Sequence, residues 1–185
     1  LDKNKFKIIE VNQNISPNGV VYRYNDEDIA KIKSCNLNLL VRCGNGILFG
    51  EILNICENGI ISFHHADNEI NRGGPPGFWE IMYREPRTGF IIQRLNEELD
   101  GGDVFYKGFI PTSWIYTLNL IMLYESSNPV LKHVIDDITS EKPKLKILVK
   151  KPYYNKIFTT PSIIIQLLYI LITFKTLLKK TFLKI

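Results

Sequence analysis

The sequence lacks the cysteine spacings that disulfide frameworks and zinc sites need. Its three cysteines, Cys35, Cys43 and Cys56, are an odd number, contain no Cys-x-x-Cys pair and have no neighbouring histidine. This pattern disfavours both kinds of site and indicates reduced thiols in the core of a cytoplasmic protein.

A secretory signal and a dinucleotide-binding glycine motif are also absent. The chain shows no basic head followed by an apolar segment and a small-residue cleavage site, and no Gly-x-Gly-x-x-Gly run follows a predicted strand. The formal net charge is only +4, and the basic residues concentrate in residues 142–184 rather than in a stripe with interleaved stacking aromatics. A nucleic-acid-binding surface is therefore disfavoured.

The chain does contain enough apolar sequence for one sizeable core. Its 185 residues are 45% hydrophobic and 23% charged, which is typical of a globular domain. Strand and helix patterns alternate and predict an α/β fold with parallel crossovers. We expect strands over 6–11, 37–41, 60–63, 90–95 and 103–110, with a turn over 14–19. We expect helices over 26–33 with Asn25 as N-cap, over 47–56, around Phe78 and Trp79, over 114–124 with Leu118, Ile121 and Met122 inward, and from Ser127 or Asn128 to near Asp137.

The central stretch, residues 62–102, gathers the candidate site residues. An apolar run over 60–63 ends at His64, and a second apolar run over 90–95 leads into a polar, glycine-containing loop with Asp100. In open α/β sheets, ligands bind outside the carboxyl ends of the strands. His64 and Asp100 are therefore candidate partners in one site.

Two motifs in this stretch resemble those of a known family. Ser62-Phe63-His64 with Arg72-Gly73 resembles the Asn-x-His and Arg-Gly signature of the formyltransferases, and Leu99-Asp100-Gly101-Gly102 resembles their Leu-Asp-(Gly/Thr)-Gly loop. The two motifs stand at the family's separation without a gap. The family includes glycinamide ribonucleotide, methionyl-tRNA and sugar-nucleotide N-formyltransferases. The chain departs from the signature at Ser62, where the family has Asn.

The resemblance implies a Rossmann-like, mostly parallel sheet of the formyltransferase type that is incomplete at the N-terminus. In the family, the catalytic domain opens with a βαβ half whose glycine-rich loop holds the phosphate of the acceptor, and we expect this half upstream of Leu1. We therefore divide the chain into the C-terminal part of the catalytic domain (1–141), a basic linker (142–161) and an apolar, basic helix (162–185).

The resemblance also implies transfer of a formyl group from 10-formyltetrahydrofolate to an amine of a sugar nucleotide, a ribonucleotide or an aminoacyl-tRNA. His64 then donates to the oxyanion of the tetrahedral intermediate, and Asp100 orients the imidazole and helps to move the proton. Ser62 occupies the position of the second oxyanion donor, but its shorter side chain has a single hydroxyl proton. Loss of one such donor typically costs about a hundredfold in rate. The alternative is a non-catalytic, formyltransferase-like binding module in a larger membrane-associated protein.

Carried over in the same way, the folate site lies between two loops. One side is formed by Asn45, Ile47 and Leu48, and the other by Asn96, Glu97 and Glu98. Arg72 is expected to bind a carboxylate or phosphate of the acceptor, with Gly73 allowing close backbone approach. The alternative for both residues is a tight surface turn with a solvated arginine.

His65 and Asp67 raise the alternative of a metal site. Together with His64 they supply three metal-ligating side chains, as in a metal hydrolase, but side chains at 64 and 65 point to opposite sides of an extended chain. We therefore expect no metal, and the role of His65 stays open.

The end of the chain has a different composition. Residues 162–174 are almost all apolar, and four lysines follow among leucines and phenylalanines. This run is shorter than the ~20 residues that span a bilayer, so we expect a helix that lies on a membrane surface or packs on another domain. A span that reaches Leu178 with Lys175 buried is the alternative.

Overall fold

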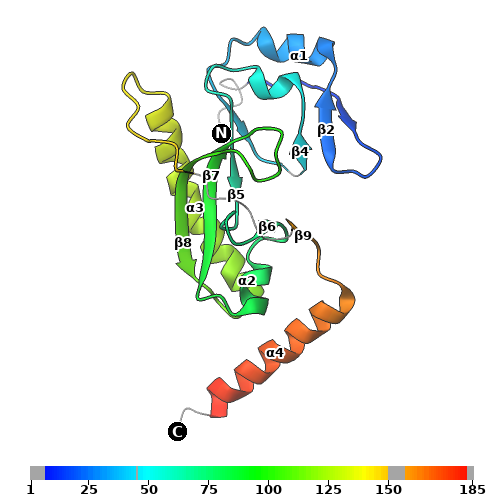
Figure 1. Cartoon of the computed structure of the whole chain (residues 1–185), viewed down its shortest axis with the longest axis vertical. Coiled ribbons are helices and arrows are strands. Elements are labelled where there is room, and N and C mark those ends of the chain that lie inside the picture. Colours follow the sequence, from blue (N-terminus) through cyan, green and yellow to red (C-terminus); the bar gives the residue numbers. More distant parts are fainter. Residues whose placement is uncertain (1–6, 45, 150–156, 183–185) are drawn as a thin grey trace.

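A four-stranded sheet forms the centre of the domain, in the order β3-β5-β7-β8 (Figure 1). The structure is a computed structural model that describes residues 7–44, 46–149 and 157–182. The strands of this sheet are β3 (Leu40–Arg42), β5 (Ile60–His64), β7 (Arg87–Arg94) and β8 (Asp103–Pro111). The helix α3 (Tyr116–Ile138) packs along β7 and β8 and covers one face of the sheet.

Parallel pairing in this sheet is confined to β3 and β5. These two strands are joined by a crossover that contains the short 3-10 helix η2 (Glu51–Asn54), as the alternating pattern predicts. β5 pairs antiparallel with β7, and β7 pairs antiparallel with β8. The loop between β7 and β8 is too short for a parallel connection, which needs a dozen or more residues. The expected α/β class is confirmed, with a mixed sheet in place of a mostly parallel one.

Two smaller sheets and two short helices surround this centre. The smaller sheets are β1 (Gln13–Ile15) with β2 (Val21–Tyr24) and β4 (Ile47–Leu48), and β6 (Arg72–Gly73) with β9 (Ile157–Phe158). The short helices are α1 (Asp26–Lys33) and α2 (Phe78–Tyr83). The side chain of Asn25 accepts the N–H of Asp28 at 2.7 Å, so the predicted N-cap of α1 is confirmed.

The helix expected over 47–56 is wrong. The N–H groups of Ile47 and Phe49 donate to backbone oxygens in and beside β2, at 2.8 and 3.0 Å, which draws this stretch into the small sheet as β4. Gly46 and Gly50 have φ angles of +79° and +91°. These left-handed values interrupt a helix, and only η2 forms after them.

The first strand lies later than expected. Residues 7–11, the described part of the strand expected over 6–11, carry no strand, and β1 begins at Gln13. A turn over 17–19 connects β1 to β2, with Gly19 at φ +72°. The turn residues are therefore correct, and pairing with β2 decides which residues become extended.

One continuous helix, α3, replaces the two helices expected over 114–124 and 127–137. Its buried positions are Asn119, Leu123, Ser127 and Val134. These positions repeat every three to four residues and face the sheet, and their burial outweighs the hydrogen bond that Pro129 removes on the exposed side. The expected inward face is wrong, because the exposed positions include Leu118, Ile121 and Met122.

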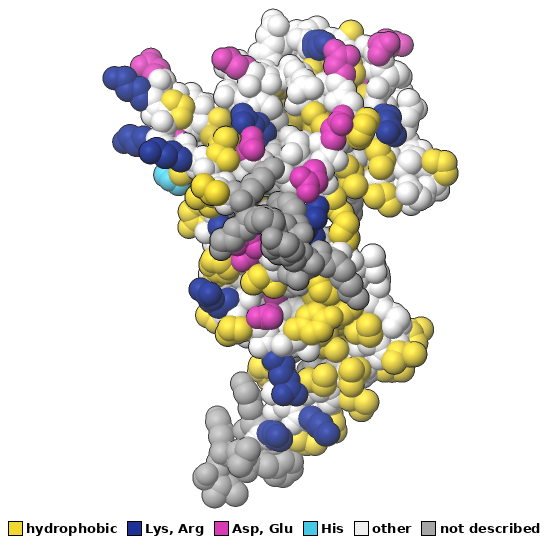
Figure 2. All heavy atoms as spheres, in the orientation of Figure 1, with side chains coloured by type: hydrophobic (Ala, Val, Ile, Leu, Met, Phe, Trp, Pro, Cys, Tyr) yellow, Lys and Arg dark blue, Asp and Glu magenta, His cyan; other side chains and the backbone are white. Residues whose placement is uncertain are grey.

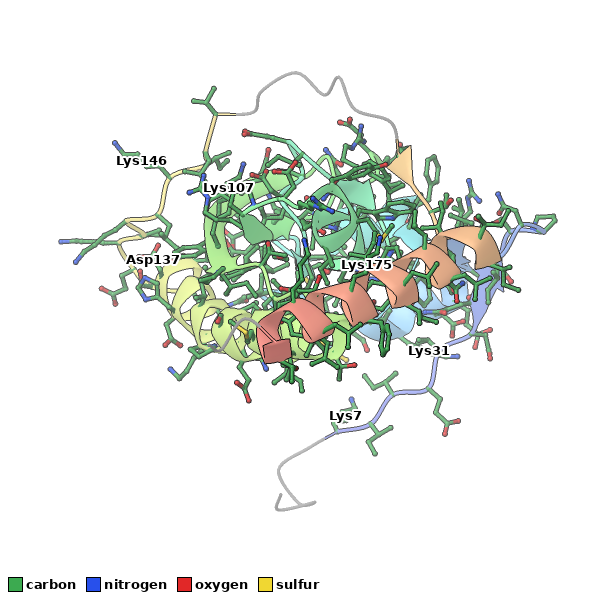
Figure 3. The ribbon with its side chains drawn as sticks, turned by 90° about the horizontal axis from the view of Figure 1, so that it is seen from below. Lys7, Lys31, Lys107, Asp137, Lys146 and Lys175 are labelled. Atoms are coloured by element: carbon green, nitrogen blue, oxygen red, sulfur yellow. The ribbon has the colours of Figure 1, made fainter. Side chains whose placement is uncertain are left out.

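The helix α4 (Ile163–Phe182) lies at the base of the domain and extends away from it (Figures 1 and 3). It contacts the domain through a mixed side, where the N–H of Tyr116 donates to the hydroxyl of Tyr169 at 2.9 Å. The half-buried positions are Ile165, Tyr169, Ile172, Thr173 and Thr176. The outward positions include Ile163, Ile164, Leu167, Leu171 and Phe174, each more than half exposed. Hydrophobic side chains accordingly gather over the lower part of the molecule (Figure 2).

This arrangement differs from that of an ordinary amphipathic helix in water, because the hydroxyl groups of α4 lie on its mixed inner side and the outward side is apolar. Among the residues that the structure describes, no helix has the length and apolarity to cross a membrane.

The predicted linker is bonded to the domain in both of its described parts. Asp137 accepts the N–H of Lys144 at 3.0 Å, and the N–H of Leu148 donates to a backbone oxygen of β8 at 2.8 Å. Further along, β9 pairs with β6, and the ring of Phe158 lies 5.1 Å from that of Trp79. Trp79 is buried.

Candidate active site

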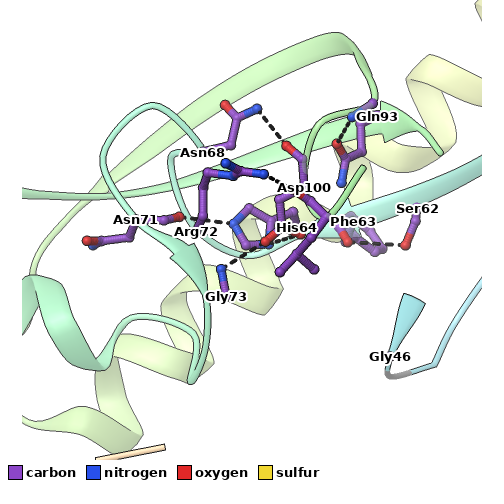
Figure 4. Close-up of polar contacts among 12 residues, drawn as sticks. Gly46, Ser62, Phe63, His64, Asn68, Asn71, Arg72, Gly73, Gln93 and Asp100 are labelled. Atoms are coloured by element: carbon purple, nitrogen blue, oxygen red, sulfur yellow. Dashed lines mark hydrogen bonds and ion pairs between the residues drawn. The ribbon is translucent and has the colours of Figure 1, made fainter. Parts of the chain in front are cut away.

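His64 and Asp100 meet at the end of β5. His64 is the last residue of that strand, and Asp100 lies in the loop between β7 and β8 with a left-handed backbone, φ +51°. The Nδ1 atom of His64 is 3.1 Å from the Oδ1 atom of Asp100, and the two side chains are 10% and 12% exposed (Figure 4). The structure thus pairs the two residues that the motifs singled out.

Asp100 is fixed by the segment that contains β6. The N–H of Gly73 donates to its Oδ2 atom at 2.8 Å, and the side-chain amide of Asn68 donates to its backbone oxygen at 3.2 Å. Gly73 has a φ of +88°, and a Cβ atom there would lie 2.1 Å from the backbone oxygen of Phe158. Glycine therefore lets β6 approach both β9 and the carboxylate.

The surroundings of the pair favour its ionised form. Burial by itself lowers the pKa of His64, but the hydrogen bond and charge of Asp100 and the backbone oxygen of Asn71 raise this pKa above its ordinary value. Burial raises the pKa of Asp100, but His64 and the N–H of Gly73 bring it below its ordinary value. The Nε2 atom of His64 is 3.2 Å from the Asn71 oxygen, so both ring nitrogens face acceptors. A doubly protonated imidazole satisfies both of them.

A cavity of about 390 Å³ opens beside the pair. Its lining includes His64, Asp100 and Ser62, which are the three predicted catalytic residues. Of the predicted folate-binding residues, those that line the cavity are Ile47, Leu48, Asn96 and Glu98. Glu97 is exposed and does not line it, and Asn45 lies outside the described residues.

Ser62 faces the backbone of its own strand region. It is 7% exposed, and its Oγ atom is 3.1 Å from the backbone oxygen of Phe63 and 3.4 Å from that of Arg42. Its single proton is therefore used by carbonyl groups at the wall of the cavity.

Arg72 is not a solvated surface arginine, so that alternative is wrong. Its side chain is 12% exposed, and its Nη2 atom is 3.4 Å from the Oε1 atom of Glu98. The same nitrogen donates to the backbone oxygen of Leu99. Arg72 therefore ties β6 to the loop of Asp100, and its contact with an acceptor remains a prediction.

His65 points away from His64, as expected for an extended chain. Its ring stacks on Phe63 at 4.9 Å between centroids, and its Nε2 atom is 3.2 Å from the hydroxyl of Ser127 on α3. Burial lowers the pKa of His65 to about 4, so the ring is neutral and packs, half-buried, between Phe63 and Tyr124.

The proposed metal ligands also diverge. Asp67 pairs with Lys107 at 2.7 Å, while His64 and His65 turn to Asp100 and Ser127. No group of three potential ligands converges within the described part of the chain. The arrangement gives a metal hydrolase no geometric basis.

The sequence did not single out three buried polar residues near the pair, namely Gln93, Asn71 and Glu80. Gln93 accepts the N–H of Gly102 at 3.1 Å and so holds the far end of the Asp100 loop. A glutamine inside an otherwise apolar strand was the available signal, because a buried amide needs a partner.

Known proteins are similar to this chain in sequence and in fold. Over 147 residues the chain is 29% identical to the methionyl-tRNA formyltransferase of Ehrlichia canis. This alignment covers 77% of this chain and 48% of that protein. A solved sugar N-formyltransferase from Shewanella sp. is 26% identical with a TM-score of 0.57, covering 70% of this chain and 52% of that one. These similarities support the assignment of the chain to the formyltransferases. They confirm the resemblance that the two motifs indicated.

A third similarity concerns the fold alone. The formyltransferase PseJ from Anoxybacillus kamchatkensis, solved with UDP-4,6-dideoxy-4-formamido-L-AltNAc and tetrahydrofolate, is 15% identical with a TM-score of 0.56. It covers 66% of this chain and 65% of that one, which supports the Rossmann-like type of the sheet. No protein-family model matches the chain. The chain spans about half the length of the curated relative from Ehrlichia canis.

Proposed function

We propose that the protein transfers a formyl group from 10-formyltetrahydrofolate to an amine. The observation that carries this proposal is the buried pair of His64 and Asp100 at the wall of a cavity. The amine attacks the formyl carbon, a carbon–nitrogen bond forms, and the bond to the folate nitrogen breaks. One proton leaves the amine, and one is delivered to the folate nitrogen.

In this proposal His64 donates a hydrogen bond to the oxyanion, and Asp100 maintains the charge and orientation of the imidazole. Both candidate donors are engaged with backbone oxygens, His64 with that of Asn71 and Ser62 with that of Phe63. These bonds, at 3.2 and 3.1 Å, are longer than charge-assisted ones. An oxyanion is a stronger acceptor than a peptide oxygen and replaces them.

The donor folate is assigned to the cavity between the two loops. Ile47 and Leu48 supply an apolar wall, and Asn96 and Glu98 supply polar groups on the other side. Such a combination suits a flat heterocycle whose edge carries donors and acceptors. The tetrahydrofolate in the PseJ structure supports a folate in this fold. Arg72 and Gly73 are assigned to the acceptor side, beside Asp100.

The test combines binding and turnover. Calorimetry with a non-transferable 10-formyltetrahydrofolate analogue is expected to give micromolar affinity, about −8 kcal/mol. Formylation of sugar nucleotides, glycinamide ribonucleotide and methionyl-tRNA is then measured for the wild type, Asp100→Asn and the exposed control Asp136→Asn. Turnover abolished by Asp100→Asn and retained by Asp136→Asn supports the proposal.

Other outcomes are equally informative. Analogue binding without turnover of any acceptor supports the alternative, a non-catalytic formyltransferase-like binding module. If the folded protein does not bind the analogue, both the folate site and the transferase activity are refuted.

We also propose that α4 lies on an anionic membrane surface. Its outward side is apolar, the helix contains no acidic residue, and Lys175 and Lys179 are exposed among leucines. A helix of 20 residues is about 30 Å long, and one side of it offers less area than the ~800 Å² per partner of a standard interface. Lipid is therefore favoured over a second copy of the chain.

Vesicle co-sedimentation tests this membrane contact. Binding to phosphatidylcholine vesicles that contain phosphatidylglycerol, but not to pure phosphatidylcholine, supports it, with loss of binding in Lys175→Gln/Lys179→Gln. A dimer in solution that shows no vesicle binding contradicts it.

A further inference from the structure

Glu80 is a buried carboxylate beside the His64–Asp100 pair that the mechanism above does not use. It lies in the first turn of α2 and is 3% exposed. Burial raises the pKa of Glu80 above its ordinary value, although the Asn71 amide, its own backbone N–H and the charge of His64 act to lower it. A buried acid in this position costs free energy unless its charge is compensated.

Asn71 connects this carboxylate to the imidazole. Its backbone oxygen lies 3.2 Å from the Nε2 atom of His64, and its side-chain amide acts on Glu80. Asn71 is only 6% exposed, and its own N–H donates to the backbone oxygen of Asp67 at 2.7 Å, which fixes its place in the loop.

Apart from the influence of the Asn71 amide on the Glu80 carboxyl, two buried atoms of this group have no hydrogen-bond partner, the Nδ2 atom of Asn71 and the Oε1 atom of Glu80. One is a donor and the other an acceptor, both are buried, and both residues are coupled to His64. Leaving either atom unsatisfied costs about 1–3 kcal/mol. A hydrogen bond between these two atoms removes both penalties. It also draws the Glu80 carboxylate toward the loop of Asn71, whose backbone oxygen faces the Nε2 atom of His64.

We propose that Glu80 and Asn71 are positioning residues that support the charged form of His64 as a second carboxylate system beside Asp100. The catalytic part of this inference rests on the proposed formyl transfer, whereas the coupling between the residues does not. The charges that act on the imidazole are then Asp100 and Glu80. The groups that act on Glu80 are His64, the Asn71 amide and Glu85, and Glu80 in turn acts on the hydroxyl of Tyr116 on α3.

The coupling is reciprocal. A positive His64 lowers the pKa of Glu80, and a negative Glu80 raises the pKa of His64. Two groups that interact in this way titrate together, so each reports the protonation of the other. Glutamine at position 80 keeps the shape of the side chain and removes its charge.

The first experiment uses the wild-type chain. Its glutamate carboxyls are labelled with ¹³C, and the Glu80 signal is followed by NMR against pH together with the ring signals of His64. We expect an inflection of the Glu80 carboxyl at the titration midpoint of His64. Absence of that inflection overturns the proposal, whether or not any variant folds.

The second experiment compares variants. Glu80→Gln is expected to lower the His64 midpoint, and the exposed control Glu57→Gln is expected to leave it unchanged. Asn71→Ala retains the backbone oxygen but removes the amide that stabilises the Glu80 charge, so it shifts the midpoint in the same direction. The double variant matches Glu80→Gln, since the amide acts through the carboxylate.

A purely structural role gives a different result. If Glu80→Gln lowers the melting temperature but leaves the His64 midpoint in place, Glu80 only stabilises the start of α2 and the proposal fails. If the coupling is present and no acceptor is formylated, the proposed function fails and the coupling stands. In an active protein, Glu80→Gln lowers kcat and moves the pH profile, with KM for the folate unchanged.

Discussion

Gly73→Ala is the most informative single change, because Gly73 contacts both β9 and the carboxylate of Asp100. A Cβ atom at this position would lie 2.1 Å from the backbone oxygen of Phe158 and 3.0 Å from the Cγ2 atom of Ile157. The φ of +88° adds about 1–2 kcal/mol for a residue with a side chain, and the overlap adds about 1–3 kcal/mol. We therefore expect a loss of about 2–5 kcal/mol in the free energy of unfolding.

Thermal and urea denaturation followed by circular dichroism measure this loss. For a chain of this size each kcal/mol lowers the melting temperature by about 2–4 °C, so the expected decrease is about 4–20 °C. The matched control is Gly44→Ala, because a Cβ atom at Gly44 meets no atom within 4 Å and its φ is not in the left-handed range. Equal melting temperatures for the two variants would refute the close approach of β6 to β9.

Three further predictions concern charge and packing. In Asp100→Asn, the stability contributed by the ion pair disappears. In the wild type, the contribution of His64 is complete below its unfolded pKa of 6.5 and is lost as the pH rises through its raised folded pKa. The contribution of Asp100 is present above its unfolded pKa of 3.8 and is lost as the pH falls through its lowered folded pKa. The difference in unfolding free energy between wild type and variant, from urea titrations at several pH values, is therefore largest between these two limits. Lys107→Met leaves a buried carboxylate unpaired and lowers the free energy of unfolding, measured by urea denaturation, by on the order of 3 kcal/mol. Lys132→Met, in an exposed pair, lowers it by less than about 1 kcal/mol. Similar losses in the two variants would contradict the burial of the Lys107 pair. His65→Phe removes a group whose pKa is lowered to about 4. The variant therefore loses less stability than the wild type as the pH falls below 6.5. An unchanged acid transition would contradict the burial of the His65 ring.

The paired residues of the site were predictable because the signal is local in sequence. His64 ends an apolar strand and Asp100 follows another, and each stands in a short motif whose residue types are tied to its chemistry. The N-cap of α1 was predictable for the same reason, since Asn25 and its partner are three residues apart. In these cases the deciding interactions lie within one element or one motif.

The errors arose where distant contacts decide the structure. Residues 47–56 have helix-compatible side chains, but bonds to residues near β2 and two left-handed glycines divide them between a strand and a short 3-10 helix. Ser127 and Asn128 before Pro129 read as the start of a new helix, yet α3 continues because its buried stripe spans the whole sheet. Glu80 likewise lies in a helix that packs against α3, where the rings of Phe78 and Tyr116 are 5.6 Å apart, and no local pattern reveals its burial.

The left-handed backbone of Asp100 has a consequence for how this position can change. Asparagine and glycine also adopt that conformation readily, and the amide oxygen of an asparagine can accept the N–H that Gly73 now gives to the carboxylate. Neither the shape of the loop nor its bond to β6 therefore needs a negative charge. The negative charge acts on His64, with which it forms the ion pair, and on Arg72. A descendant that lost the chemistry could therefore exchange aspartate for asparagine in a single step and keep the loop.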